Sequence, residues 1–346
     1  MPAGTSNGLA VPEPRLSQLT KIVERVRAGR RVVLTTHVNA DADGAGSEAA
    51  VAAWLESIGV GVTIINPTPF PESLRFLLHR DGLVVDVDDP AAPALINEAC
   101  CLLVLDTSEE NRVGALNALL DPAKTFVVDH HPPGPAVVGQ GGVQDPSAAA
   151  TGELVYDMIS IAGDDWPTAS AIAAYVAIVS DTGSFRYSNT TWRTHAIASE
   201  LLALGVNPEE VFQRLFAVVP PRRILLLREA LARLEHDPEQ GLAWMVVPKQ
   251  VSDSIGSTSD DYEGLIEHAR SIEGTRVAVL FRETAPGETK ISLRSTGPVN
   301  VNRVARQFGG GGHVKASGAS VKLALDDAVK QVLDAVRKEI ELTRRS

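Results

Sequence analysis

Four apolar runs that each end abruptly in Asp or His place the strongest constraint on how this chain folds. In the clearest one, Val127 and Val128 are followed at once by Asp129, His130 and His131. The other three are residues 34–36 before His37, Asp41 and Asp43, residues 102–105 before Asp106, and residues 177–180 before Asp181. Asp and His are poor strand residues and costly to bury unpaired. One such ending would suggest a polar turn, but four favour the carboxyl edge of a parallel sheet, where open α/β folds bind ligands.

The periodicity of the first 240 residues favours alternating strands and helices. Strand patterns occur at 31–36, 60–65, 101–105 and 125–128, and residues 37–47 form the expected loop after the first of them. Helical spacing is found at 16–28, 48–57, 113–120, 151–162, 169–179, 194–204, 208–216 and 221–235. Strands that alternate with helices are typical of an α/β fold, so we expect a doubly wound, mainly parallel sheet.

The pattern changes at residues 236–241, where a polar, turn-forming cluster follows the last of these helices. Beyond it we expect strands at 242–247, 276–281, 289–294 and 319–323, with helices at 299–308 and 325–343. A chain of 346 residues is long enough for two cores. We therefore predict a disordered N-terminus (1–14), a first domain (15–220), a connector helix and linker (221–240), and a smaller α/β domain (241–346).

Charge is distributed unevenly along the chain. Residues 1–240 hold 17 Lys and Arg against 30 Asp and Glu, a balance of −13, whereas residues 241–346 have a balance of +2. An acidic first domain does not attract long duplex nucleic acid, but it suits a carboxylate-rich site that metal cations neutralise.

No apolar run is long enough to span a membrane, the N-terminus lacks a signal-peptide core, and the two cysteines are adjacent. We expect a cytoplasmic protein without a membrane partner.

The residues that follow the four apolar runs are the donor types of a metal centre. They are His37, Asp41, Asp43, Asp106, His130 and Asp181, each expected just beyond a strand. Carboxylates gathered at one sheet edge repel one another unless protons or cations lie between them. Oxygen ligands with a minority of imidazole favour Mn²⁺ or Mg²⁺ over Zn²⁺, and six ligands favour two ions that share a carboxylate. In an extended loop Asp41 and Asp43 would point to opposite sides, so each would serve a different metal.

The order of these motifs resembles the DHH phosphoesterases, a family named for the Asp-His-His signature seen here at residues 129–131. Four signatures match in order: His37-x-x-x-Asp41-x-Asp43, Asp106 after a strand, Asp129-His130-His131, and Ser180-Asp181-Thr182-Gly183. The run GGGGHVKASG at 309–318 is similar to the substrate-binding motif of the DHH-associated C-terminal domain. In the first loop, Ala40 and Gly44 replace the family's usual proline and alanine, at positions without a proposed ligand. The resemblance covers nearly the whole chain and points to the bacterial nanoRNases.

This resemblance implies a hydrolase with two Mn²⁺ per chain, or with Mg²⁺ in their place. By motif, the six ligands divide into His37, Asp41 and Asp106 for one metal and Asp43, Asp106, His130 and Asp181 for the other. Asp129 then orients an imidazole and His131 faces the substrate, either as the acid for the leaving oxygen or as a hydrogen-bond donor to a phosphoryl oxygen. The nanoRNases degrade very short oligoribonucleotides and dephosphorylate 3′-phosphoadenosine 5′-phosphate (pAp), and some hydrolyse pApA or cyclic di-AMP. The resemblance also implies a homodimer.

The glycine run and nearby basic residues are the candidates for substrate binding. They are Gly310, Gly311, Gly312, His313, Arg294 and Lys315, of which Lys315 is the weakest. Glycines let backbone amides approach a phosphate closely, although a glycine run by itself fits a flexible hinge better. Arg294 would fork onto a 5′-phosphate, unless it is an exposed strand arginine. Arg186 lies five residues beyond Asp181 and is expected at the catalytic site.

We interpret the sequence as a two-domain phosphodiesterase and phosphomonoesterase that acts on short 5′-phosphorylated nucleotides in a cleft between its domains. An inorganic pyrophosphatase of the same superfamily is disfavoured by the glycine-run domain, and a single-strand exonuclease by the acidic first domain. A non-catalytic nucleotide sensor is the rival of another class, and the presence of all six ligands argues against it. Which of pAp, pApA, cyclic di-AMP and RNA dimers is preferred stays open.

Overall fold

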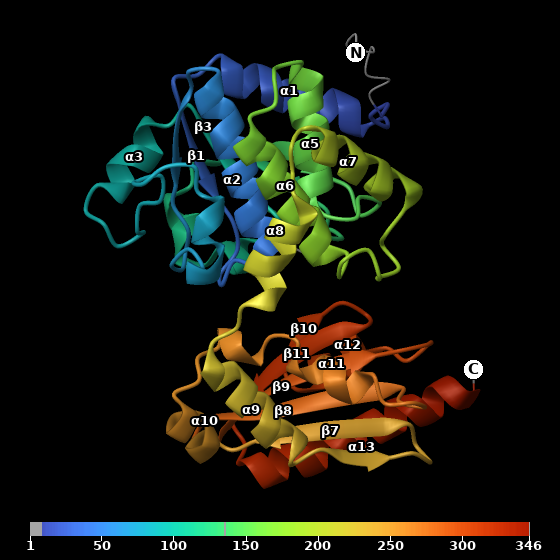
Figure 1. Ribbon diagram of the computed structural model, residues 1–346. Helices are drawn as coiled ribbons and strands as arrows, with labels where there is room; N and C mark the ends of the chain where they lie inside the picture. Colours follow the sequence, from blue (N-terminus) through green and yellow to red (C-terminus); the bar gives the residue numbers. More distant parts are fainter. Residues whose placement is uncertain (1–8, 135, 346) are drawn as a thin grey trace. The chain divides into compact units, whose positions relative to one another are not determined.

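The computed structural model describes residues 9–134 and 136–345, and it divides into two compact units between Val218 and Val219 (Figure 1). Of the N-terminus expected to be disordered, residues 1–8 lie outside the described residues. Residues 221–240, expected to be a connector, include helix α9 (Pro221–Leu231) and strand β6 (Glu235–Asp237) of the second unit. Each helix in the described ranges is too short or too polar to cross a bilayer.

The first unit is built on a five-stranded, wholly parallel sheet with the spatial order β2-β1-β3-β4-β5. Its strands are β1 (Arg31–Thr35), β2 (Gly61–Ile64), β3 (Cys101–Leu105), β4 (Thr125–Asp129) and β5 (Gly141–Gln144). Along β1, Val32 and Leu34 enter one core while Val33 enters another, so both faces are covered. The predicted doubly wound parallel sheet is therefore confirmed. From β1 the chain continues outward to β2 on one side, whereas β3, β4 and β5 follow one another on the other side. This change of direction opens a crevice at the carboxyl ends of β1 and β3.

Helices α2, α5 and α6 pack closely against one another beside this sheet (Figure 1). Gly152 of α5 permits the contact, because a Cβ there would lie 2.6 Å from Ala177 Cβ of α6. Gly46 of α2 is equally constrained, since its Cβ would lie 2.8 Å from the Ala173 carbonyl oxygen. The α-helices of this unit are α1 (Arg15–Arg27), α2 (Ala42–Ser57), α3 (Ala92–Glu98), α4 (Glu110–Val113), α5 (Thr151–Ala162), α6 (Thr168–Asp181), α7 (Trp192–Ala203) and α8 (Pro208–Phe212).

Two local predictions for this unit are wrong. Asp181 does not follow a strand, because the apolar run before it is the last part of α6, as the helical spacing at 169–179 indicated. This helix is buried along most of its length and therefore lacks a polar side. The expected loop at 37–47 ends early, since α2 begins at Ala42. Asp41 is the reason: its Oδ1 caps the helix by accepting hydrogen bonds from the backbone N–H groups of Asp43 (3.0 Å) and Gly44 (3.1 Å).

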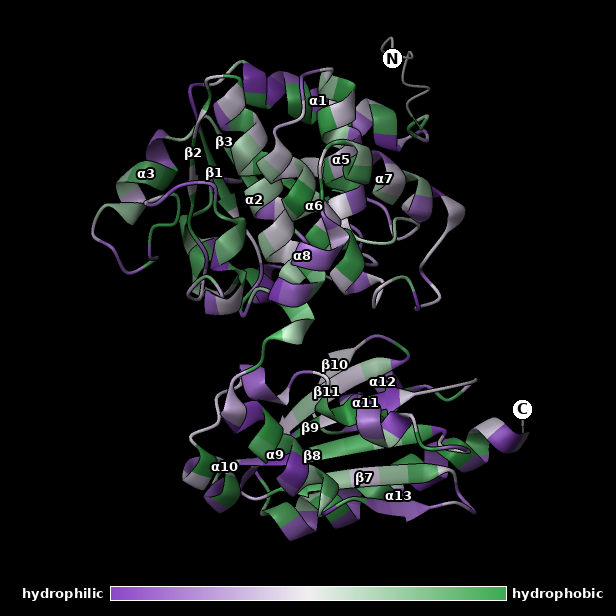
Figure 2. Cartoon of the chain, viewed as in Figure 1, coloured by the Kyte–Doolittle hydropathy of each residue, from purple (hydrophilic) through white to green (hydrophobic). Residues whose placement is uncertain are grey.

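The second unit is a six-stranded mixed sheet with the order β10-β11-β9-β8-β7-β6, in which β7 and β8 pair in parallel and the other pairs are antiparallel. Its further elements are β7 (Leu242–Val247), α10 (Lys249–Ile255), α11 (Leu265–Arg270), β8 (Val277–Ala285), β9 (Glu288–Ser295), α12 (Val301–Gln307), β10 (Gly311–Gly312), β11 (Ala316–Val321) and α13 (Leu325–Arg345). Helices α12 and α13 pack on one face, and α9, α10 and α11 pack on the other. Figure 2 shows α13 with hydrophobic and hydrophilic residues in bands, as expected for a helix with one buried side. The smaller α/β domain is thereby confirmed.

Candidate metal centre

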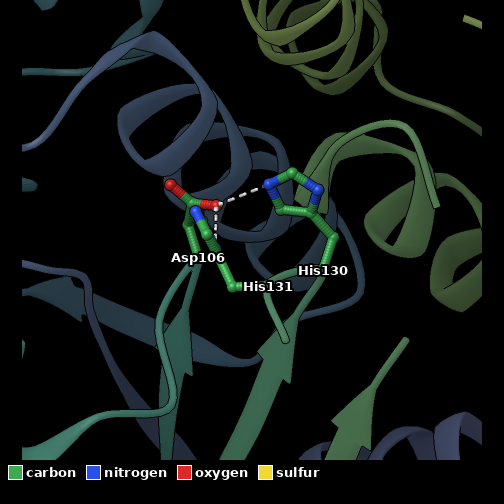
Figure 3. A group of neighbouring side chains, drawn as sticks. All are labelled: Asp106, His130 and His131. Carbon is green, nitrogen blue, oxygen red and sulfur yellow. Dashed lines mark ion pairs between the residues drawn. The ribbon is translucent and has the colours of Figure 1, made fainter. Parts of the chain in front are cut away.

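Three neighbouring strands of the first sheet end at candidate metal ligands. His37 lies two residues after β1, Asp106 directly follows β3, and His130 directly follows β4. Figure 3 shows Asp106 and the imidazoles of His130 and His131 converging at the tips of their strands, with a contact from Asp106 to each ring. The backbone of Asp106 has a φ of 62°, a left-handed conformation that is uncommon for residues other than glycine and that is concentrated at functional sites. The structure therefore gathers these residues at the carboxyl edge of the sheet.

The first group of candidate ligands surrounds His37. Its Nε2 lies 3.3 Å from Asp106 Oδ2 and 3.7 Å from Asp41 Oδ2. This nitrogen is buried and has no hydrogen-bond partner among the described residues, which is a costly state that a metal ion would relieve. Burial alone would lower the pKa of His37, but the carboxylates of Asp106 and Asp41 raise it to about 10. In the absence of a metal, these carboxylates therefore favour the protonated form of His37.

The second group surrounds His130, whose Nε2 is also buried without a hydrogen-bond partner in the described part of the chain. This atom lies 3.7 Å from Asp43 Oδ2, 3.6 Å from Asp106 Oδ1 and 3.5 Å from Asp181 Oδ2. Burial and repulsion from Asp106 and Asp181 raise the pKa of Asp43 well above its ordinary value, and burial raises that of Asp181 to about 6. The two oxygens of Asp106 face the two different groups. Both groups therefore have the donor types of a divalent-cation site, and Asp106 lies beside each of them.

The N-terminus of α5 holds two of these carboxylates in place. The backbone N–H groups of Thr151 and Gly152 donate hydrogen bonds to the two oxygens of Asp43, at 2.7 and 2.9 Å. The Thr151 hydroxyl donates to Asp106 Oδ1 at 2.9 Å. Amides at a helix N-terminus lack partners within the helix and carry partial positive charge, so they favour a carboxylate. Thr151 and Gly152 were not predicted, since the sequence shows only that they open a helical pattern.

Asp129 contacts one imidazole of the centre, that of His131. Asp129 Oδ1 lies 2.8 Å from His131 Nδ1 and accepts a 3.0 Å hydrogen bond from the His131 backbone N–H. Asp129 Oδ2 accepts a 3.3 Å bond from the side-chain amide of Gln144 on β5. Burial would lower the pKa of His131, but Asp129 and Asp106 raise it above its usual value. Asp129 therefore orients His131, whose Nδ1 lies 3.7 Å from Asp106 Oδ1.

The segment after Asp181 bends back toward it. Asn189 donates from its side-chain nitrogen to the backbone carbonyls of Asp181 at 3.0 Å and Ala149 at 2.8 Å, which fixes the end of α6. Arg186 instead donates from Nε to the carbonyl of Gly183 at 2.6 Å, a bond within its own turn. The structure thus adds Asn189 to the residues around the centre, whereas the catalytic role of Arg186 stays a prediction.

In the second unit, the glycine run and Arg294 line one cavity of about 610 Å³. Arg294 Nε lies 3.4 Å from Glu267 Oε1 of α11, so the guanidinium is already near a carboxylate. Gly310 and Gly312 are required by packing, because a Cβ on either would collide with the backbone of β11, whereas a Cβ on Gly311 would meet nothing within 4 Å. Gly310 and Gly312 therefore allow the glycine run to pack closely against β11, a structural role that the sequence did not indicate.

The two other candidates of this unit lie beside the run. Lys315 Nζ donates to the carbonyls of Gly297 and Val299, and it does not line the cavity. The backbone of His313 forms a tight turn, in which its N–H donates to the Ala316 carbonyl at 2.7 Å. The binding roles of both residues remain predictions.

Comparison with known proteins shows similarity along most of the chain. The family model described as "DHH family, N-terminal domain" matches residues 31–179, and that of the DHHA1 domain matches residues 246–342. The bifunctional oligoribonuclease and PAP phosphatase NrnA of Thermus thermophilus is 34% identical over 337 residues, which cover 95% of this chain and 97% of that protein.

Solved structures agree with these matches. An exopolyphosphatase-related protein from Bacteroides fragilis superposes with a TM-score of 0.88 and 26% identity, covering 97% of this chain and 99% of the other. RecJ of Thermus thermophilus, solved in complex with Mn²⁺, shares the fold with a TM-score of 0.52 and 17% identity. The superposition covers 97% of this chain and 56% of the RecJ chain.

Proposed function

Because the chain belongs to the DHH family and carries a DHHA1 domain, we propose that it is a metal-dependent hydrolase of very short oligoribonucleotides and of pAp. The observation that carries this proposal is the pair of ligand groups around Asp106, with two buried imidazole nitrogens that lack a hydrogen-bond partner in the described residues. The substrate class follows from the relatives, which are named for oligoribonuclease and PAP phosphatase activities. We extend this substrate class to pApA and cyclic di-AMP, whose nucleotides are joined by phosphodiesters as in an oligoribonucleotide.

In this proposal the six candidate ligands hold two cations. His37, Asp41 and Asp106 would bind one, and Asp43, Asp106, His130 and Asp181 would bind the other. When bound, Mn²⁺, or Mg²⁺ in its place, supplies Lewis acidity toward the phosphoryl group and neutralises the carboxylates. The amides of α5 keep Asp43 oriented for this task, as does the Thr151 hydroxyl for Asp106.

His131 is proposed to act on the substrate directly. Its Nδ1 lies 2.8 Å from Asp129, which fixes the ring and favours the protonated imidazole. A ring held in this way can donate to a phosphoryl oxygen or protonate the leaving oxygen. In the second unit, Arg294 and the amides of the glycine run are proposed to bind a substrate phosphate within their cavity.

The rivals make different predictions for one substrate panel. An inorganic pyrophosphatase would release phosphate from pyrophosphate, a processive exonuclease would prefer a long strand, and a nucleotide sensor would bind without turnover. The cavity of about 610 Å³ beside the glycine run favours a nucleotide, because it is larger than a ligand as small as pyrophosphate would fill. We also propose that the enzyme acts in the cytoplasm, where RNA decay produces short fragments, and that it is a homodimer, which light scattering would test.

The test is incubation of the full-length protein and Mn²⁺ with pAp, pApA, cyclic di-AMP, pyrophosphate and a long adenylate, with products separated by chromatography. We expect AMP from pAp and pApA, at higher rates than any product from the long strand. The Asp106→Asn variant is the matched control, because Asn tolerates the left-handed backbone at this position. Pyrophosphate as the best substrate, or turnover that persists in the variant, would contradict the proposal.

A further inference from the structure

One face of the second sheet is covered over only part of its width. Helices α9, α10 and α11 pack on β7 and β8, where Ala278 and Leu280 enter their core, and α11 also contacts β9. The same face continues across β9 and β11, and there it lines the cavity of about 610 Å³. Along β9, Ile291 and Leu293 point into the core under α12 and α13, so Lys290, Ser292 and Arg294 stand on the cavity side. The cavity therefore has a defined floor made by alternate residues of β9.

The register of the strands places a cation at each end of this floor. Lys290 is paired across β8 with Arg282 and across β11 with Ser320. Ser292, in the middle, lies opposite Gly318, so the floor there carries only small side chains. Arg294 lies at the other end, beside the glycine run. Four residues of extended strand separate Lys290 from Arg294 by about 13 Å, so these ends are two distinct positions.

The charges at the two ends are balanced differently. Arg294 lies 3.4 Å from a carboxylate oxygen of Glu267. Lys290 and Arg282 face each other directly across two strands, an arrangement of like charges that destabilises a sheet. Neither forms an ion pair with a carboxylate within the described residues. Lys290 is exposed for the most part, and its partial burial together with the charge of Arg282 lowers its pKa. The Arg282 guanidinium is held in place over the ring of Tyr262, 4.5 Å from its centroid.

Lys290 lines the polar cavity, and Arg282 stands next to it on the same face of the sheet. Two neighbouring like charges without a carboxylate ion pair in the described residues form a site for an external anion. The Ser292 and Ser320 hydroxyls line the same cavity and supply further hydrogen-bond donors. We propose that Lys290 and Arg282 form a second phosphate subsite, which binds a further phosphate of a nucleotide whose first phosphate lies at the Arg294 end. The choice of a nucleotide as the ligand rests on the proposed function, whereas the anion preference rests on the residues alone.

The chemical source of the second phosphate is the next phosphodiester of a short strand, as in pApA. The two phosphates of ADP share one bridging oxygen, so they lie too close together to reach both ends of the floor. ADP and AMP would each occupy only the Arg294 end.

The test is isothermal titration calorimetry of the full-length protein treated with EDTA, so that no turnover occurs, with AMP, ADP and pApA. Lys290→Ala removes the cation, Lys290→Arg keeps the charge, and Lys322→Ala serves as the matched control because Lys322 is exposed at the end of β11. We expect Lys290→Ala to weaken the binding of pApA by about tenfold, the usual scale of a charge-assisted contact, and to leave the binding of AMP and ADP unchanged. Lys290→Arg should retain most of the affinity.

Loss of affinity for pApA but not for ADP would show that the subsite binds the second phosphate of a strand. Equal weakening of all three ligands, or no change beyond that of Lys322→Ala, would overturn the subsite. Turnover with Mn²⁺ is measured separately on the same proteins. Cleavage of pApA without any dependence of binding on Lys290 would refute the subsite alone, and Lys290-dependent binding without cleavage of any nucleotide would refute the proposed function alone.

Discussion

Glu48 of α2 should make the metal-free protein less stable as the pH rises. This side chain is fully buried, and burial raises its pKa to about 8 from an ordinary value of 4.5. Its Oε2 accepts a 2.9 Å hydrogen bond from the side-chain amide of Asn66, while Oε1 has no partner among the described residues. Asn66 in turn accepts a 3.2 Å bond from the backbone N–H of Thr36, directly before His37. Through Asn66, Glu48 therefore helps to fix the backbone at the end of β1. Its ionised form is destabilised by burial.

The sign and size of the effect follow from proton linkage. Between pH 4.5 and about 8 the folded protein keeps the Glu48 proton that the unfolded chain releases, so stability falls as the pH rises through this window. Each pKa unit corresponds to about 1.4 kcal/mol, which gives a loss of roughly 3 kcal/mol between pH 5 and pH 8. Glu48→Gln removes the titration and keeps an oxygen for Asn66. The variant should match the wild type at pH 5 and exceed its stability by roughly 3 kcal/mol at pH 8.

The assay is urea unfolding of the EDTA-treated proteins at both pH values, in which a gain of this size moves the midpoint by roughly 1 M. Comparison with the wild type cancels the titration of groups that both proteins share. Glu56→Gln on the same helix is the control: a hydrogen bond from Arg80 lowers the pKa of Glu56, so its loss should not stabilise the protein at pH 8. An equal gain at both pH values for Glu48→Gln, or a loss at pH 8, would refute the reasoning.

Three further predictions concern binding and turnover. Thr151→Val should weaken Mn²⁺ binding by about 10–100-fold in calorimetry, because it removes the hydroxyl that orients Asp106, whereas Thr151→Ser should not. His313→Ala should raise KM for pApA and leave Mn²⁺ binding unchanged; loss of Mn²⁺ would place His313 among the ligands. In a time course, pApA should be cleaved faster than ApA, which lacks the 5′-phosphate, and faster than a long adenylate repelled by the acidic first unit. Equal rates on all three would argue for an exonuclease.

The sheet and the positions of most candidate metal ligands were predictable because each lies at a boundary that the sequence marks. Asp106 and His130 directly follow strands whose continuous apolar runs are required for burial on both faces of a parallel sheet. Strand β5 was not predicted, because Gly141 and Gly142 leave only Val143 as an apolar signal. Its place in the sheet follows from pairing with β4, which only tertiary structure reveals.

The supporting residues of the centre were not predictable, since their partners are remote in sequence. Thr151 bonds a carboxylate 45 residues away, and Asn189 bonds a carbonyl 40 residues away, at Ala149. Short polar residues such as these occur throughout the chain, so no local pattern distinguishes them. The burial of Glu48 was hidden for a similar reason, because α2 is covered on nearly all sides by other elements.

Titration of the EDTA-treated protein with Mn²⁺, followed by calorimetry, tests the central claim most directly. The two ligand groups share Asp106, whose Oδ2 lies 3.3 Å from His37 and whose Oδ1 lies 3.6 Å from His130. The account predicts that the wild type binds two Mn²⁺ per chain and that Asp106→Asn weakens both sites more than any other single ligand change. A single Mn²⁺ in the wild type, or two tightly bound ions in Asp106→Asn, would contradict it.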